Sequence, residues 1–394
     1  MILSDVCEFI VDCPHSTAPD EGEGYPLIRT PNVGKGRLDL NGVHRVSESV
    51  YKQRIQRGAP RANDLIFARE APAGNVALVQ ENQTVCLGQR TVLIRPNVQK
   101  VNPQYLVYYL LSPKPQYELL GTANGATVAH VNLPAIRNLK IELPEKSVQD
   151  KIGTILVTYD DLIENNQKQI KLLEEAAQRL YKEWFVDLRF PGHENTKIVD
   201  GVPEGWQWCK VRDVADINSS ALPKNYKEDF IDYVDLGSVR CGHIETRTRY
   251  NLNEAPGRAK RCAKDGDIIW GMVRPNLKAY ALVTNPKETD VFSTGFAVLS
   301  AKKVPYSYLY CAVTQEEFVG YLVNATNGAA YPAVKPVHFE VADILKPDDK
   351  VLEQFHSVAD SIYRKKETLE NQNHNLRESR DLILPKLMSG EVEV

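Results

Sequence analysis

Long apolar runs are absent from this sequence of 394 residues. No stretch of about 18 apolar residues occurs, so we expect no membrane-spanning helix and no membrane partner. The segment Met1–Asp5 has no basic residues leading into an apolar stretch, so we expect no signal peptide. The seven cysteines are odd in number and form no Cys-x-x-Cys pair, which argues against a disulfide framework and a structural zinc site. Together these absences predict a cytoplasmic protein.

Catalytic motifs are also missing. The glycine cluster Gly34–Gly36 lacks the spacing of a cofactor-binding turn, and no phosphate-binding loop occurs. The sequence contains no Glu-x-Lys, the commonest signature of metal-dependent nucleases. The eight histidines are scattered, and we interpret His130 and His338 as structural or surface residues. We therefore expect no catalytic centre, no metal site and no cofactor bound by this chain.

Charge is balanced over the whole chain but not along it. The net charge is −3, and 43% of the residues are hydrophobic, as in a globular protein with a sizeable core. Residues 29–100 nevertheless carry 12 Lys and Arg against 5 Asp and Glu, and residues 236–287 carry 10 against 4. Either stretch alone could be ordinary solvated surface. One such stretch in each half favours two surfaces for an anionic partner.

The chain is an internal duplication with a period of 203–208 residues. Ordered matches with small shifts indicate that one structural unit occurs twice. The matching segments are Leu3-x-Asp5-Val6 with Ile10 and Val211-x-Asp213-Val214 with Ile217, Val33-x-x-Gly36-x-Leu38 and Val239-x-x-Gly242-x-Ile244, Asp64–Phe67 and Asp267–Trp270, Asn124–Ala126 and Asn327–Ala329, and Pro144 with Val148 and Pro347 with Val351.

Each half ends in a long amphipathic segment whose apolar residues recur at steps of three and four, as in a coiled coil. Asn166 interrupts the first seam, and Pro385 should stop or kink the second helix. Because the seams match, we predict that the helices pack antiparallel; the alternative is that each helix covers only its own domain. The seam residues are Val148, Ile152, Ile155, Tyr159, Leu162, Ile170, Leu173, Ala177, Leu180 and Trp184, then Val351, Phe355, Val358, Ile362, Leu369, Asn373, Leu376, Arg380, Ile383 and Leu387.

Short β-branched runs separated by Gly, Pro and Asn precede each helix and are typical of strands joined by turns. We therefore predict an α+β fold, a tandem duplication of a mixed α/β domain followed by a long helix. The predicted boundaries are 1–146 and 206–349 for the mixed domains, 147–188 and 350–390 for the helices, and 189–205 for the linker.

This organisation resembles the specificity subunit of type I restriction–modification systems, over nearly the whole chain. Leu382–Val392 (LILPKLMSGEV) is close to the closing motif of that family, and Leu180–Asp187 (LYKEWFVD) is similar to its central motif. Asp64–Arg69 and Asp267–Trp270 resemble its GDIL strand. Leu143–Gln149 resembles a degraded form of the family's entry into the long helix.

The resemblance implies a subunit that binds double-stranded DNA and has no catalytic activity. In this family each target-recognition domain binds one half of a split sequence, and the helices set the gap between the halves. The resemblance also implies two methyltransferase subunits and restriction (translocase) subunits as partners. S-adenosylmethionine, ATP and Mg are expected only in those partners.

Base recognition requires side chains that match the base edges, such as Arg for guanine and Asn or Gln for adenine. Loops at strand ends are the usual carriers of such side chains. In the first domain we predict contacts from Arg69 and Glu70, which precede a loop with Pro and Gly, and from Gln89 and Arg90. The alternative is that Arg69 and Glu70 form a salt bridge.

Contacts to DNA phosphates need positively charged side chains, not side chains that match the edge of a particular base. Arg29 and Lys35 suit that role in the first domain, unless they are ordinary surface residues. The corresponding stretch of the second domain contributes Arg274, Asn276 and Lys278. Arg69 and Arg274 are not strictly aligned in the repeat, as expected of two domains that recognise different sequences.

Two other classes of protein remain open. The chain could be a fragment of a fused methyltransferase–specificity enzyme, which methylation by the purified chain alone would reveal. It could also be a coiled-coil adaptor that binds no nucleic acid, and salt-dependent DNA binding would exclude that class.

Overall fold

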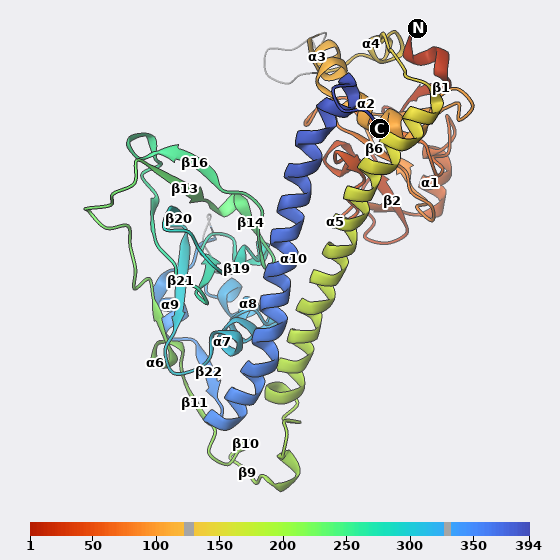
Figure 1. Ribbon diagram of the computed structural model, residues 1–394. Coiled ribbons are helices and arrows are strands. Elements are labelled where there is room, and N and C mark those ends of the chain that lie inside the picture. The colour runs from red at the N-terminus through yellow and green to blue at the C-terminus, as the bar shows by residue number, and fades with distance from the viewer. Residues whose placement is uncertain (122–129, 327–331) are drawn as a thin grey trace. The chain divides into compact units, whose positions relative to one another are not determined.

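The computed structural model describes residues 1–121, 130–326 and 332–394 (Figure 1). The repeated segments Asn124–Ala126 and Asn327–Ala329 lie outside the described residues. The chain divides into two compact units, one formed by Met1–Gln167 with Asn371–Val394 and the other by Lys168–Glu370. Each unit therefore contains one mixed domain and a part of each long helix. Of the helices in the described ranges, none is long and apolar enough to cross a membrane.

A five-stranded sheet in the order β1–β8–β5–β6–β3 forms the frame of the first unit. Its strands are β1 (Cys7–Asp12), β3 (Gly36–Arg37), β5 (Leu65–Ala68), β6 (Val76–Leu78) and β8 (Thr91–Pro96). A smaller sheet has the order β4–β2–β7, with β2 (Tyr25–Ile28), β4 (Arg45–Val46) and β7 (Cys86–Leu87). The helical elements are η1 (Leu3–Val6), η2 (Thr30–Asn32), α1 (Glu48–Arg54), α2 (Pro103–Leu111), α3 (Pro113–Gly121) and α4 (Leu133–Arg137).

Strand β5 is buried on both faces, which explains why its sequence is continuously apolar. Leu65 and Phe67 belong to the core that includes α2. Ile66 and Ala68 point the opposite way, into a core that includes Ile28 of β2. The strand period of two residues separates these two sets, so β5 holds both layers of the domain together.

The second unit repeats this frame with a four-stranded sheet in the order β12–β21–β18–β19. Its strands are β12 (Ala215–Ile217), β18 (Ile268–Gly271), β19 (Tyr280–Leu282) and β21 (Phe296–Ala301). A second sheet has the order β16–β13–β20–β17, with β13 (Phe230–Val234), β16 (Thr248–Asn251), β17 (Ala259–Arg261) and β20 (Asp290–Ser293). Two-stranded pairs are β9 (Ile198–Val199) with β10 (Val202–Pro203), β11 (Gln207–Lys210) with β22 (Asp343–Lys346), and β14 (Val239–Arg240) with β15 (His243–Ile244). The helical elements are η4 (His193–Asn195), α6 (Val211–Val214), η5 (Leu236–Ser238), η6 (Leu252–Glu254), η7 (Pro275–Leu277), α7 (Tyr306–Val313), α8 (Glu316–Asn324) and α9 (Pro336–Glu340).

The strand registers confirm the duplication. The first sheet aligns Ile10, Ile94 and Leu65 across three strands, and the second aligns Ile217, Leu299 and Ile268. Asp64 and Asp267 directly precede the equivalent strands, and each carboxylate accepts a hydrogen bond from the backbone N–H three residues earlier in the chain. The segments that match in sequence therefore occupy the same places in the two frames.

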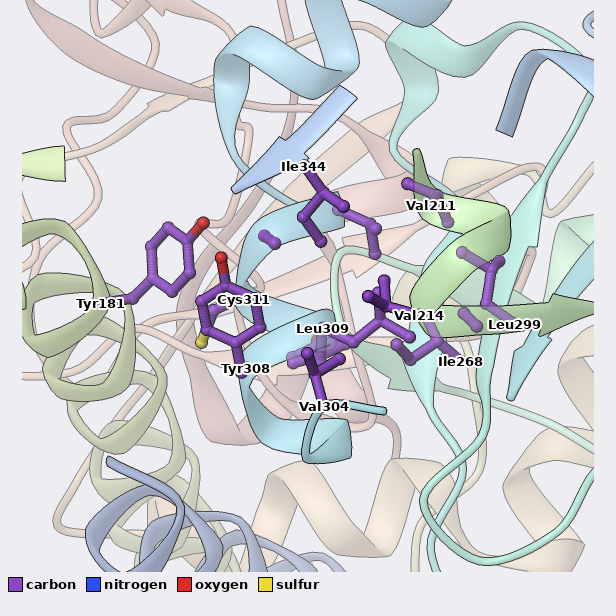
Figure 2. Close-up of a cluster of buried hydrophobic side chains, with 14 of the residues drawn as sticks. Tyr181, Val211, Val214, Ile268, Leu299, Val304, Tyr308, Leu309, Cys311 and Ile344 are labelled. Carbon is purple, nitrogen blue, oxygen red and sulfur yellow. The ribbon is translucent and has the colours of Figure 1, made fainter. Parts of the chain in front are cut away.

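Figure 2 shows part of the core of the second unit, where α6, α7, β18, β21 and β22 meet α5. Tyr181 of α5 faces Tyr308 of α7, with ring centroids 5.5 Å apart. The hydroxyl of Tyr308 donates to the backbone oxygen of Leu345, so this deeply buried polar group has a partner. Helix α5 is thus an integral part of the second core and not a separate strut.

The long helices are α5 (Lys146–Tyr181), followed by the π-helical turn η3 (Lys182–Val186), and α10 (Asp349–Ser389). Within each unit they lie side by side and antiparallel, because rising residue numbers in α5 meet falling numbers in α10 (Figure 1). In the first unit Leu387 shares a core with Ile152, and Asn373 bonds Asn166. In the second unit Lys366 pairs with Glu174, and Phe355 packs on Trp184.

Two details of the predicted helices were wrong. Leu162 and Val358, placed in the seams, are each 46% exposed, and their neighbours Ile163 and Ala359 are buried instead. The reason is that each helix packs on a mixed domain as well as on the other helix. The buried residues therefore do not follow the three-and-four spacing of a two-helix seam. Pro385 does not stop the second helix, which continues to Ser389.

Candidate DNA interface

The loop between β5 and β6 begins at Arg69, where the buried strand ends. Gly74 closes this loop with a positive φ of 91°, and its N–H donates to the oxygen of Ala68 at 2.9 Å. Val131, which follows α3 in the chain, donates its N–H to the oxygen of Arg69 at 3.0 Å. The loop is therefore anchored at its base and presented on a rigid sheet.

Arg69 lies inside this anchor and is only 8% exposed. Its Nε donates to the oxygen of Val131 at 2.8 Å, and its Nη1 pairs with Asp12 at 2.7 Å. Its Nη2 lies 2.7 Å from Nε2 of His130. Because every side of the guanidinium is engaged, the structure gives no support to the prediction that Arg69 contacts a base. Arg69 instead holds strand β1 and the segment after α3 against the loop.

Glu70 and Arg90, which are far apart in the sequence, meet at the surface of the first unit. Arg90 Nε lies 2.9 Å from Glu70 Oε2, and the Arg90 side chain is 61% exposed. Glu70 also accepts from Nδ1 of His130, since Nε2 of that imidazole must accept from a guanidinium that can only donate. The alternative interpretation, an Arg69–Glu70 salt bridge, is not what the structure shows, because Arg69 pairs with Asp12 and Glu70 with Arg90.

The loop between β7 and β8 supplies the rest of this surface. The N–H of Arg69 donates to the oxygen of Arg90 at 2.9 Å, and Gln89 Nε2 donates to the oxygen of His15 at 3.1 Å. Gly88 leaves room for Arg29, because a Cβ at that position would lie 2.8 Å from Arg29 Cγ. The structure thus brings four of the predicted residues, Arg29, Glu70, Gln89 and Arg90, to one side of the domain around Arg69.

Arg29 is half-buried, and its buried Nε has no hydrogen-bond partner among the described residues. The side chain keeps its charge near Gly88, in the loop that also carries Gln89 and Arg90. Lys35 is exposed in the turn before β3 and belongs to a different surface, where the next residue, Gly36, meets Asp160 of α5. Lys35 therefore remains a separate candidate for a phosphate contact.

The sequence did not single out Asp12, His15 or His130 as parts of this surface. Asp12 and His15 leave the end of β1 and approach each other to 3.4 Å. No local motif marks them, because their connection to Arg69 and Gln89 arises only when β1 pairs with β8. Among the residues that the structure describes, no group of three His, Cys, Asp or Glu could hold a metal ion.

In the second unit, the equivalent loop joins β18 to β19 and contains the turn η7. Arg274 and Lys278 flank this turn in left-handed conformations, with φ of 49° and 54°. Such backbone is strained for residues other than glycine and asparagine, and it clusters at functional sites. The N–H of Arg274 donates to the oxygen of Pro332 at 2.8 Å, and Lys278 pairs with Glu316 of α8. The turn is held firmly at both ends.

The top of this turn faces solvent. Arg274 and Asn276 are exposed, as predicted for DNA contacts, and Leu277 between Asn276 and Lys278 is 59% exposed. The shared strand register places Met272, not Arg274, at the position of Arg69. The two domains therefore present different side chains from equivalent edges of two equivalent sheets.

Comparisons with known proteins agree with this architecture. Residues 1–175 match the model of the type I restriction modification DNA specificity domain. The chain is 27% identical to the type I restriction enzyme MjaIX specificity subunit of Methanocaldococcus jannaschii over 90% of this chain and 83% of the relative. It is 22% identical to the HindI specificity subunit of Haemophilus influenzae over 85% and 87%. Over most of its length, this chain is similar to specificity subunits of type I restriction–modification systems.

A solved structure has a similar fold. The type I restriction–modification S subunit from M. genitalium aligns with 98% of this chain and 95% of its own, with a TM-score of 0.58 at 14% identity. At that identity the likeness concerns the fold alone.

Proposed function

We propose that this chain is a specificity subunit that recognises a bipartite DNA sequence, with one domain for each half of the target. The observation that carries the proposal is that the same sheet edge, repeated in two frames, presents exposed but different polar loops. Identical frames give both domains the same way of approaching DNA. Different loops give them different bases to recognise.

In the first domain, Arg90 and Glu70 form the central contact. Arg90 would bind the acceptor edge of guanine, and Glu70 would accept from a cytosine amine, which together match one G·C pair. Arg29 would bind a phosphate through its positive charge. In the second domain, Asn276 would bind adenine and Arg274 a guanine or a phosphate.

The long helices have two roles in this proposal. At a rise of about 1.5 Å per residue, 36 residues of α5 extend about 54 Å, enough for a spacer between two half-sites. Exposed apolar residues, Leu172 at 63% and Leu382 at 71%, suit the docking of partner subunits. Methyltransferase subunits that bind S-adenosylmethionine, and restriction subunits that use ATP and Mg²⁺, are the partners we propose, and this chain itself is non-catalytic.

The test is to express this chain with the methyltransferase subunit of its own system and to map methylated adenines genome-wide. We expect a split motif with a constant gap. DNA binding by the complex should also weaken steeply with salt, because phosphate contacts release counterions.

A continuous motif, or binding that ignores salt, would contradict the proposal. Methylation by the purified chain alone, without a partner, would instead support the fused-enzyme alternative. A catalytically inactive methyltransferase subunit provides the control, since it should leave DNA binding intact while removing the methylation signal.

A further inference from the structure

The two long helices bury polar side chains against each other in both units. In the first unit, Asp160 is 3% exposed and pairs with Arg380 at 2.5 Å, and Asn166 Nδ2 donates to Asn373 Oδ1 at 3.0 Å. In the second unit, Lys366, 6% exposed, lies 2.6 Å from Glu174. Helix α5 supplies both acids and helix α10 both bases.

The same helix positions are buried in both halves of the duplication. An offset of 203 residues carries the buried positions of α5 onto those of α10 and brings Pro144 onto Pro347. The helices therefore use one packing surface with different residues on it. The equivalent buried pairs are Ile152 and Phe355, Leu156 and Ala359, Asp160 and Tyr363, Ile163 and Lys366, Asn166 and Leu369, and Ile170 and Asn373.

Because the surfaces are equivalent, each helix could in principle pack against a second copy of itself. Pairing α5 with α5 would replace each α10 partner by its equivalent in α5. Asp160 would then face Ala177, Asn166 would face Ile170, and Glu174 would face Ile163. Asp160 would lose its cation and keep only the hydroxyl of Tyr108, and Asn166 would lose its amide partner. Glu174, whose side chain is 24% exposed, would lose Lys366. Each of these losses disfavours the like pair.

Pairing α10 with α10 fails in the same way. Arg380 would face Tyr363, and Asn373 would face Leu369. Lys366 would meet Arg377, a second cation in place of Glu174. Two like charges would then lie together, and their repulsion would add to the cost of keeping Lys366 buried.

From these contacts we infer that the buried polar residues of the long helices are a pairing pattern, which joins the first half of the chain only to a second half. The pattern rejects association of like halves, including halves of two different copies. This inference stands without the proposed function. If that function holds, the pattern ensures that every assembled subunit carries two different recognition domains.

The experiment uses the full chain with a protease site inserted between Val199 and Asp200, exposed in the β9–β10 turn. The folded protein is cleaved, and unlabelled and ¹⁵N-labelled samples are mixed in urea that separates the halves, then diluted. Native mass spectrometry counts the pairs. Label-mixed pairs of a first with a second half show that exchange has occurred.

We expect pairs of unlike halves only, at least ten times more abundant than pairs of like halves. Like pairs near the statistical ratio of one to two to one would overturn the inference. The variant Asn166→Leu with Asn373→Ile gives each helix the residue of the other at the equivalent position. This variant should raise the share of like pairs, whereas the exposed pair Asn165→Leu with Asn375→Ile should not.

A second measurement, on the uncleaved chain, tests the inference even if the separated halves do not reassociate. Glu174→Lys places a cation against Lys366, as pairing of like α10 helices would, and should lower the urea midpoint of unfolding. Adding Lys366→Glu should restore part of that loss, although Lys366 also donates to the oxygen of Gly242. Equal losses in the single and double variants would overturn the inference.

Discussion

At the scale of single residues, burial separates two arginines that look alike in the sequence. Arg69 and Arg90 both lie beside recognition loops, yet Arg69 is engaged on all sides and Arg90 is mostly exposed. Removing one partner of a buried ion pair lowers the stability of the fold much more than removing one partner of a surface pair. Substitution of Arg69 should therefore lower folding stability much more than substitution of Arg90.

Arg69→Met should destabilise the fold by about 3 kcal/mol, because Asp12 would be left buried without its partner. Urea unfolding of the purified chain measures this. Arg90→Gln should change stability by less than about 1 kcal/mol, since its pair with Glu70 is solvent-exposed on the Arg90 side. Equal stability of both variants would show that the Arg69 network does not support the domain.

His243 is the residue with the clearest dependence on pH. Burial acts to lower its pKa, but hydrogen bonds to Glu174 and Glu370 outweigh burial and the nearby Lys366, and raise the pKa to about 9. The protonated imidazole therefore stabilises the fold fully below pH 6.5, its ordinary pKa. That stabilisation is lost as pH rises toward 9.

We expect stability to fall by about 1 kcal/mol between pH 6.5 and 9 on account of His243, less than the full shift implies because its side chain is 38% exposed. His243→Gln should flatten this slope in urea unfolding measured across that range. His374→Gln, at an exposed histidine of α10, provides the matched control. An unchanged slope in His243→Gln would contradict the assignment.

At the scale of elements, the long helices serve two partners at once. Each packs against the other helix and against a mixed domain, so its buried stripe is wider than a coiled-coil seam. Apolar spacing predicts that such helices exist and roughly where they begin and end. It does not predict which of two adjacent apolar residues turns inward, as Leu162 and Ile163 show.

Ile163→Ala should destabilise the chain by about 2–4 kcal/mol, because Ile163 is 7% exposed and its removal leaves a cavity. Leu162→Ala should cost less than about 1 kcal/mol, since that side chain is 46% exposed. Thermal unfolding of both variants gives a direct comparison. A larger loss of stability in Leu162→Ala than in Ile163→Ala would instead support the predicted seam, in which Leu162 faces inward.

At the scale of the whole molecule, the two duplicated domains share the arrangement of their strands but differ in the sequences of their loops. The two sheets share their strand order and register, while the loops after β5 and β18 differ in sequence and conformation. Changes to one loop should therefore leave the other domain's DNA contacts untouched. This independence is what distinguishes two recognition domains from one merged surface.

In the assembled complex, Arg90→Gln should relax recognition at one half of the methylated motif, by about 1–3 kcal/mol for a lost base contact. Arg274→Gln should relax only the other half. Methylome mapping of cells that carry each variant measures both effects, with the exposed Lys52→Gln as a control. Damage to both halves by either substitution would contradict the assignment of one domain to each half.

The sequence by itself determined the duplication, the α+β class and the two long helices, because these follow from apolar periodicity and repeated order along the chain. Tertiary structure alone decided which polar residues are buried. Arg69 meets Asp12 and His130 only because β1 pairs with β8 and residues 130–131 lie against the loop. Glu174 and Lys366 meet only because the helices run antiparallel. Such contacts join residues that are distant in the chain, and their burial, which sets their energies, is a property of the packed fold and not of any local pattern.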